Sequence, residues 1–240
     1  MSPLEIRPQV HDLIRMRDGV EFVRLRAQEM GRLFRSGYGL SAIVGLTESQ
    51  VTKIVPRENS DKFPLFVGNI NAPRQIVIAG GNIPKERVLA EACRQRASNT
   101  VRLRVSVLSH CPLLQPVTEV LARRIAGMSL NSPRATYVGN VSARALRSKE
   151  RIGDDLVHNI AHCVRWHDAT TVLKEFGCQL FLDAYDHRTR AAEPARCWLN
   201  ASLSSYTTEN IVFRAARASQ YVRGKGAGAE QITRAATRTC

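Results

Sequence analysis

The chain has 240 residues, of which 44% are hydrophobic, so a packed core is feasible and disorder throughout the chain is excluded. Lys and Arg number 35 against 21 Asp and Glu, and the resulting net charge of +14 indicates an acidic partner: a phosphorylated small molecule, an acidic protein, an anionic membrane or nucleic acid. Aromatic residues make up only 6% and no segment alternates basic with aromatic residues, which argues against nucleic acid.

Local patterns favour an intracellular setting. The six cysteines form no C-x-x-C pair, and the chain is long for a disulfide scaffold, so a reduced cytoplasmic protein is the simplest reading. No stretch approaches the roughly 20 apolar residues of a membrane span. Residues 1–19 are charged throughout and lack the apolar centre of a secretory signal. We therefore expect no membrane partner.

Residues 18–36 predict an amphipathic helix, with Asp18 and Glu21 at capping-box spacing. The apolar side of this helix comprises Phe22, Val23, Ala27, Met30, Leu33 and Phe34. Arg26 falls inside this apolar arc, where a guanidinium needs a carboxylate, a phosphate or carbonyl groups as partner. A structural ion pair is the simpler reading from periodicity alone, and an anion-binding role is the alternative.

The next segment alternates strands and helices. The predicted elements are a strand at 41–46, a helix at 47–55 with a Thr47–Gln50 capping box, strands at 64–70 and 74–80 joined by a turn at 71–73, a helix at 84–97 capped by Asn82, and a strand at 100–108. The order β-α-β-β-α-β is that of a ferredoxin-like motif. We therefore predict a ferredoxin-like subdomain at about 40–108.

Helical spacing resumes after residue 110. The predicted elements are a helix containing Leu114, Val117, Val120, Leu121 and Ile125, a strand at 134–143, a helix at 153–166, a helix from Asp168 as cap to Gly177 as stop, a strand at 178–185, and a candidate helix at 207–218 followed by a basic tail. We divide the chain into a core of 1–39 and 109–206, the subdomain at 40–108, and the terminal helix and tail at 207–240.

The junction at 105–114 reads VSVLSHCPLL, so that His110 follows the last strand of the subdomain. A loop at this point can present an imidazole to a cleft between the two parts of the fold. From the residues alone, a histidine that simply fills a loop is the simpler interpretation.

Several motifs occur together in a recognisable order. They are VRLRAQEM, SAIVGL, NINAPRQIVIAGG, VSVLSHCPLLQPV, YVGNVSA and VRWHDATTVLKEFG. From about residue 18 to about residue 184, the chain resembles the malonyl-CoA:acyl-carrier-protein transacylase family. The stretch NIAHCVRWHDATTVLKEFGCQLFLD most resembles the epsilon subunit of malonate decarboxylase, which loads malonyl onto that enzyme's own carrier protein.

The resemblance implies an α/β fold: a partial acyltransferase core, α/β-hydrolase-like, with the inserted subdomain. It implies that His110 is the general base and acid, and that Arg26 binds the free carboxylate of malonyl and so selects malonyl over acetyl. Asn159 stands where the family usually carries a glutamine, and its backbone carbonyl would orient the His110 ring. The implied partners are malonyl-CoA, an acidic acyl carrier protein and other malonate decarboxylase subunits, without cofactor or metal.

His158 and His162 are four residues apart, as two zinc ligands on one helix would be. However, Asn159 replaces the glutamate of an H-E-x-x-H motif, and the family uses no metal. We therefore expect surface or supporting roles for these histidines and for Cys163 and His167.

The family nucleophile, a serine in a G-x-S-x-G elbow, has no match in the sequence. The nearest segment is 127–131, GMSLN, which lacks the second glycine. The family's N-terminal glycine-rich loop and its late G-P-G are also missing, so that the chain looks like the C-terminal two-thirds of a transacylase. Two main functions stay open: an acyltransferase, or a non-catalytic remnant that binds a carrier protein or has no activity. A basic nucleic-acid binder is a third, weaker alternative.

Overall fold

The computed structural model describes residues 13–34, 36–103, 105, 107–133, 135–178, 180–182 and 189–191. The predicted helix at 207–218 and the basic tail lie outside the described residues. The chain divides into two compact units, one of Gln9–Ala169 and the other of Met1–Pro8 with Thr170–Cys240.

A four-stranded antiparallel sheet forms the first half of the larger unit. Its strands are β1 (Tyr38–Val44), β2 (Leu65–Ala72), β3 (Gln75–Gly81) and β4 (Asn99–Arg102), in the spatial order β2-β3-β1-β4. The four predicted strands and their β-α-β-β-α-β order with two helices are thus confirmed. The last strand is shorter than the predicted 100–108, because Val107 packs against helices beyond the sheet and Leu108 is buried outside it.

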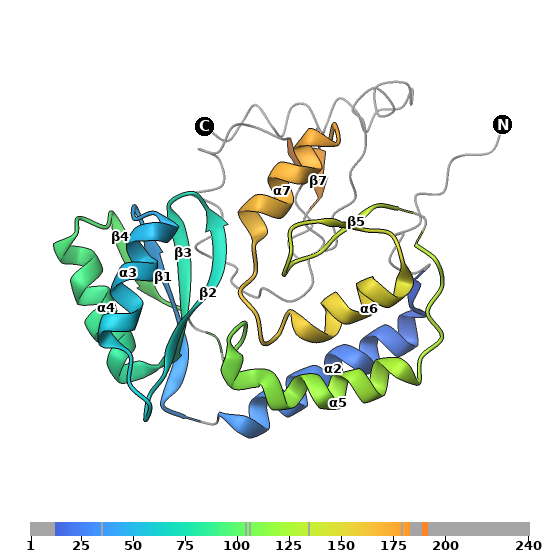
Figure 1. Cartoon of the computed structure of the whole chain (residues 1–240), viewed down its shortest axis with the longest axis horizontal. Coiled ribbons are helices and arrows are strands. Elements are labelled where there is room, and N and C mark those ends of the chain that lie inside the picture. Colours follow the sequence, from blue (N-terminus) through green and yellow to red (C-terminus); the bar gives the residue numbers. More distant parts are fainter. Residues whose placement is uncertain are drawn as a thin grey trace. The chain divides into compact units, whose positions relative to one another are not determined.

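Helices α3 (Glu48–Glu58) and α4 (Asn82–Arg94) cover one face of this sheet (Figure 1). Their apolar sides and the sheet enclose a buried cluster that includes Ile43, Ile54, Ile76, Ile78 and Val88. The Thr47–Gln50 capping box is present, with the Gln50 amide donating to Thr47 Oγ1 at 3.3 Å. The predicted Asn82 cap is wrong: Gly81 precedes the helix, and Asn82 Oδ1 accepts a hydrogen bond from Lys85 Nζ at 2.8 Å.

Three helices lie side by side in the other half of the larger unit: α2 (Met16–Leu33), α5 (Gln115–Ala126) and α6 (Lys149–His158) (Figure 1). A short 3-10 turn, η1 (Pro112–Leu114), leads into α5. Their common core comprises Phe22, Met30, Leu114, Val117, Leu121, Val157, Ile160 and Ala161. This packing explains why hydrophobic spacing alone located α2 and α5.

Helix α2 differs from its prediction in two respects. It begins at Met16, so Asp18 lies inside the first turn and the predicted capping box is wrong. Its buried side is narrow and comprises Phe22, Arg26 and Met30, whereas Ala27 and Leu33 are exposed. The burial of Arg26 inside the apolar side, expected from the helical spacing, is confirmed.

Helix α6 is shifted toward the N-terminus relative to the predicted 153–166. Ser148 Oγ accepts a hydrogen bond from the Arg151 amide at 3.3 Å and begins the helix, which ends at His158. Residues 159–165, which we call the connecting segment, leave the helix because Val164 pairs with the edge strand β2. The predicted strand at 134–143 shrinks to β5 (Tyr137–Val138), which pairs with β6 (Ala145–Leu146).

Helix α7 (Trp166–Glu175) continues into the smaller unit. Gly177 adopts a φ of +82°, which only glycine adopts readily, and ends the helical segment as predicted. Asp168 lies in the first turn rather than at the cap, and its carboxylate binds Arg165. β7 (Leu180–Leu182) lies within the predicted strand at 178–185 and pairs antiparallel with β8 (Thr189–Ala191).

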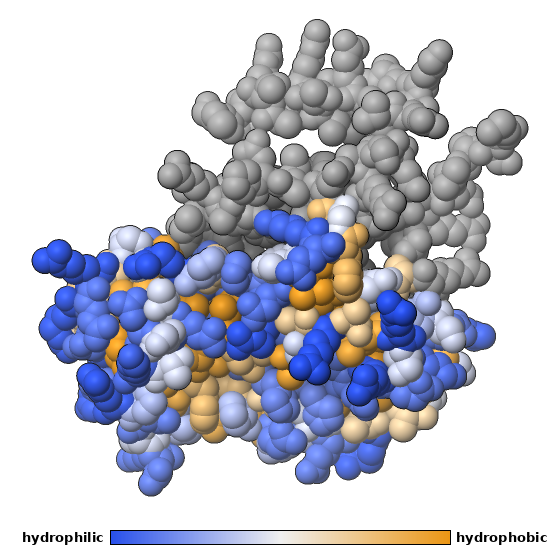
Figure 2. All heavy atoms as spheres, turned by 45° about the horizontal axis from the view of Figure 1, so that its top comes forward, coloured by the Kyte–Doolittle hydropathy of each residue, from blue (hydrophilic) through white to orange (hydrophobic). Residues whose placement is uncertain are grey.

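Figure 2 shows one face of the described residues, on which hydrophilic side chains predominate and apolar ones appear between them. The large apolar side chains that are exposed are Met16, Val20, Leu33, Ile83 and Phe176. Among the helices that the structure describes, none combines the length and apolar composition needed to cross a lipid bilayer.

Candidate functional site

The structure brings the three predicted site residues together. The side-chain oxygen of Asn159 accepts a hydrogen bond from Arg26 Nη1 at 2.8 Å, and its backbone oxygen lies 2.8 Å from His110 Nδ1. All three residues are at most 2% exposed. Asn159 therefore joins the arginine and the histidine in one buried network.

The contact to Asn159 decides the tautomer of His110. A carbonyl oxygen only accepts hydrogen bonds, so Nδ1 must carry the proton and donate it. In the neutral ring, Nε2 then carries the lone pair. This is the tautomer that a general base needs when it removes a proton through Nε2.

The backbone of His110 is held in an unusual conformation. Its φ of +59° lies in the left-handed region, which costs a residue other than glycine about 1–3 kcal/mol. The flanking Ser109 and Cys111 are both buried, so the surrounding packing maintains this conformation. Such strain is concentrated at functional sites.

The sheet supports the His110 segment from one side. Strand β2 has a register irregularity between Val67 and Asn69, at Gly68. A Cβ atom at Gly68 would lie 3.1 Å from the Cβ of Ala79 and 3.5 Å from the carbonyl oxygen of His110. The His110 carbonyl therefore lies directly against the sheet at Gly68, where a side chain would crowd Ala79.

The connecting segment fixes Asn159 from both ends. At its start, the Asn159 amide donates to the Asp155 carbonyl at 3.0 Å. At its end, the Val164 amide donates to the Gly68 carbonyl, and the Ile70 amide donates to the Val164 carbonyl, each at 2.8 Å. Asn159 is thereby held between α6 and the edge of the sheet.

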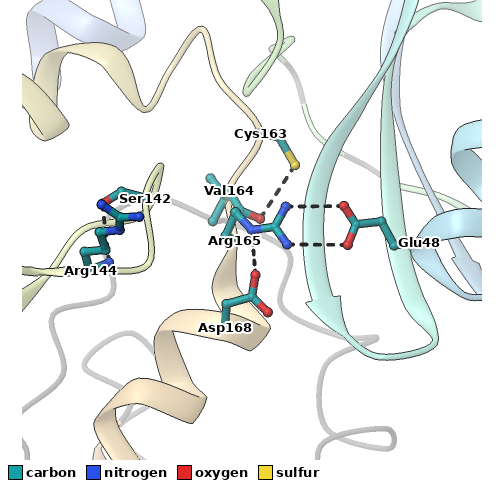
Figure 3. Close-up of polar contacts among 7 residues, drawn as sticks. All are labelled: Glu48, Ser142, Arg144, Cys163, Val164, Arg165 and Asp168. Atoms are coloured by element: carbon teal, nitrogen blue, oxygen red, sulfur yellow. Dashed lines mark hydrogen bonds and ion pairs between the residues drawn. The ribbon is translucent and has the colours of Figure 1, made fainter.

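Arg165 adds a charged anchor at the end of the connecting segment. Its guanidinium faces the Glu48 carboxylate of α3 at 3.3 Å and also binds Asp168 of α7 (Figure 3). Figure 3 also shows the Cys163 thiol directed toward the Val164 carbonyl. The segment is thus attached to α3 by charge and to β2 by backbone pairing.

Sequence reasoning missed Asp155, one helical turn before Asn159. Its buried carboxylate accepts hydrogen bonds from the Tyr137 hydroxyl at 2.7 Å and from the amides of Asn140 and Val141, both at 3.1 Å. Burial, and then the Asp155 carboxylate, raise the pKa of Tyr137, while the Arg26 charge lowers it. The available signal was the i, i+4 spacing of Asp155 and Asn159 on one side of a helix.

The thiols near the site are not activated. Burial raises the pKa of Cys111 to about 12 and that of Cys163 to about 11. Both are therefore protonated at neutral pH, and a protonated thiol is a poor nucleophile. Burial therefore disfavours the thiolate form at both positions.

His158 at the end of α6 and His162 after it contact each other. His162 Nδ1 lies 2.8 Å from the His158 carbonyl oxygen, and the two rings meet edge to face with centroids 6.0 Å apart. Within the described ranges, no three His, Cys, Asp or Glu side chains are grouped so as to hold a metal ion.

Comparison with known proteins extends these observations. No family model matches the chain. It is 32% identical over 155 residues to the malonyl CoA-acyl carrier protein transacylase of Salmonella typhimurium. The aligned region covers 64% of this chain and 50% of that protein. The transacylase structure from Coxiella burnetii superposes with a TM-score of 0.66 at 29% identity, over 70% of this chain and 53% of that one.

A further match is a malonyl-transacylase in complex with a type II polyketide synthase acyl carrier protein, with a TM-score of 0.64 and 30% identity over 69% of this chain and 54% of that one. The chain spans about half the length of the curated relatives that it matches. Over about 70% of its own length, the chain is therefore a partial relative of the malonyl-CoA:acyl-carrier-protein transacylase family.

Proposed function

We propose that this chain binds malonyl thioesters and carries the base and the carboxylate-binding arginine of malonyl transfer. The observation that carries the proposal is the double contact of Asn159, whose side chain holds Arg26 while its backbone holds His110. A substrate whose carboxylate and reacting carbonyl are a few atoms apart, as in malonyl, can address both residues at once.

His110 would serve as the proton carrier. With Nδ1 donating to Asn159, Nε2 takes the proton of an attacking hydroxyl as its oxygen bonds to the thioester carbonyl carbon. When the carbon–sulfur bond breaks, the same proton passes to the departing thiolate sulfur. The second half of the transfer, to a carrier-protein thiol, runs through these steps in reverse.

Arg26 would select the acyl group. Its guanidinium lies on the buried side of α2, between Phe22 and Met30, where the low dielectric strengthens pairing with a carboxylate. Acetyl offers this guanidinium no anion, so binding acetyl-CoA would forgo the ion pair.

The net charge of +14 supports the proposed partners, because CoA carries phosphates and acyl carrier proteins are acidic. The stretch 159–183 supports the finer assignment as a malonate decarboxylase epsilon subunit, whose partners would be that enzyme's carrier protein and its other subunits. The missing G-x-S-x-G favours the second candidate, a carrier-protein-binding remnant without turnover.

Calorimetric titration with malonyl-CoA and acetyl-CoA tests the proposal. We expect the chain to prefer malonyl-CoA by roughly tenfold or more, since a buried ion pair is worth more than the 1.4 kcal/mol that a tenfold change requires. Arg26→Gln should abolish this preference, whereas Arg24→Gln, at an exposed site on the same helix, should retain it. Equal binding of the two thioesters by the unmodified chain would contradict the proposal.

A further inference from the structure

A buried carboxamide in the sheet lacks partners. Asn69 of β2 is fully buried, and neither its Nδ2 nor its Oδ1 has a hydrogen-bond partner among the residues that the structure describes. Leaving such a group unsatisfied costs about 1–3 kcal/mol, so each case in a folded protein needs a reason. The NINAP motif that contains Asn69 has no role in the steps described above.

The side chain of Asn69 lies on the face of the sheet opposite α3 and α4. The next residue, Ile70, pairs with Ile76, and both belong to the cluster under these helices. Because side chains alternate between the faces of a strand, Asn69 and its partner Val77 lie on the other face.

The His110 segment lies on that same face. Ile78 of β3 belongs to the cluster under α3 and α4, so the side chain of the next residue, Ala79, lies on the opposite face, which is the face of Asn69. A Cβ at Gly68 would contact Ala79 on this face and would also approach the His110 carbonyl. The residue directly before Asn69 therefore adjoins the histidine.

The connecting segment links Asn69 to the site a second time. Val164 pairs with Asn69 as an isolated parallel bridge, and the same segment begins at Asn159, which holds Arg26 and His110. Two separate contacts thus place the backbone of residues 68 and 69 against both segments that carry the network, with the Asn69 carboxamide on the sheet face that adjoins His110.

The chemistry of the open groups identifies a ligand class. A carboxamide with both ends available is satisfied by a group that accepts and donates side by side, which a secondary amide does. A carboxylate or a thioester carbonyl would use only Nδ2 and leave Oδ1 unsatisfied. The pantetheine arm shared by CoA and by the prosthetic group of acyl carrier proteins contains such amides.

We propose that Asn69 Nδ2 and Oδ1 bind an amide of the pantetheine arm beside His110. This proposal rests on the proposed function, since it specifies the part of the thioester that the same site holds. In the ligand-free chain the carboxamide is covered, so the arm would replace the side chains that cover it and keep water away from the hydrogen bonds.

The test replaces Asn69 with an apolar side chain of similar size. Asn69→Leu should leave the melting temperature of the ligand-free chain unchanged or raise it, because it removes an unsatisfied amide. The same change should weaken calorimetric binding of pantetheine and of CoA by about tenfold, the loss expected for a pair of hydrogen bonds. Asn69→Ala, as a second variant, should weaken binding equally.

The structure offers a matched control. Ser41 of β1 is also fully buried with a hydroxyl that lacks a partner, but it pairs with Ile78 and so lies on the face under α3 and α4. Ser41→Ala should leave the binding of pantetheine and CoA unchanged. Binding of carrier protein with its prosthetic group (holo) and without it (apo) separates the two sources of the arm. Asn69→Leu should weaken binding of the holo form and leave binding of the apo form unchanged.

Three results would overturn the proposal: unchanged CoA and pantetheine binding in both Asn69 variants, no binding of either ligand by the unmodified chain, or a melting temperature lowered by several degrees in Asn69→Leu. The Arg26→Gln variant keeps the two proposals distinguishable, because it should lower affinity for malonyl-CoA while leaving that for CoA unchanged. Equal binding of malonyl-CoA and acetyl-CoA by the unmodified chain, with CoA binding still weakened in Asn69→Leu, would overturn only the acyl-selecting role.

Discussion

Asn159 gives two acceptors to two different residues, one from its side chain and one from its backbone. A substitution at this position therefore removes one contact and keeps the other. The hydrogen bond to Arg26 requires the asparagine side chain at position 159, whereas the hydrogen bond to His110 requires only the backbone carbonyl at that position.

Asn159→Ala should separate these contacts. Removing the acceptor of a buried charged donor should lower the free energy of unfolding by about 1–3 kcal/mol and weaken malonyl-CoA binding. The His110 tautomer, followed by ¹⁵N NMR of the ring, should stay the same, because its acceptor is a backbone oxygen. His158→Ala, at the exposed neighbouring position, should change neither quantity; a changed tautomer in Asn159→Ala would contradict the backbone role.

Lys85 is a second residue with a measurable consequence. It is only 3% exposed, and burial, with a smaller contribution from Arg102, lowers its pKa from 10.5 to about 8. The unfolded chain keeps this proton up to about pH 10.5, so between pH 8 and 10.5 the unfolded state binds more protons and stability rises with pH.

Lys85→Met should therefore stabilise the protein at pH 7, by at most about 3 kcal/mol, and this advantage should shrink to near zero by pH 10.5. Guanidinium unfolding across this pH range measures the difference. Lys53→Met, at an exposed position of α3, provides the control and should show no such trend. A constant difference between Lys85→Met and the unmodified chain at all pH values would contradict the shifted pKa.

At the scale of elements, the edge strand β2 supports the site. Its irregularity at Gly68 lets the His110 segment lie against the sheet, and its outer edge pairs with the connecting segment. One strand thus holds both chain segments that carry the histidine and its acceptor.

Gly68→Ala tests this support. The new methyl group would crowd the Ala79 side chain at 3.1 Å and contact the His110 carbonyl at 3.5 Å, and overpacking against Ala79 costs about 1–3 kcal/mol of stability. Malonyl-CoA affinity should fall as well, because a shift of the strand at position 68 that relieves Ala79 displaces the His110 carbonyl in contact with it. Gly31→Ala on α2, where nothing lies within 4 Å, should instead stabilise the chain by about 0.5–1 kcal/mol in urea unfolding. Full affinity in Gly68→Ala would argue against the support.

The predicted and observed elements agree where local pattern and packing act together. The Thr47–Gln50 box and the strands of the sheet were predictable because local hydrogen bonds and alternation define them. The helix predicted at 153–166 fails after His158, because Val164 pairs with a strand distant in sequence. The left-handed backbone of His110 and the burial of Asn69 also depend on distant contacts, so spacing could not reveal them.

At the scale of the molecule, the Arg26–Asn159–His110 network joins the four-stranded sheet to the three-helix layer. His110 lies where the chain passes from the sheet to α5, and Asn159 lies where α6 passes to the sheet edge. Arg26, from α2, completes the network from a third segment. The family resemblance located these residues, while the structure explains how segments 133 and 49 residues apart meet at Asn159.

The central claim is our proposal that this chain supplies the base and the arginine of malonyl transfer but not the nucleophile. Incubation with radiolabelled malonyl-CoA tests it directly. The 240-residue chain should form no malonyl-enzyme and transfer nothing to an acyl carrier protein, because the sequence contains no G-x-S-x-G serine. A version extended upstream of residue 18 by a G-x-S-x-G segment of the kind that the family resemblance implies should do both, and His110→Ala should abolish both in that version. A stoichiometric, hydroxylamine-sensitive malonyl adduct on the 240-residue chain would contradict the account.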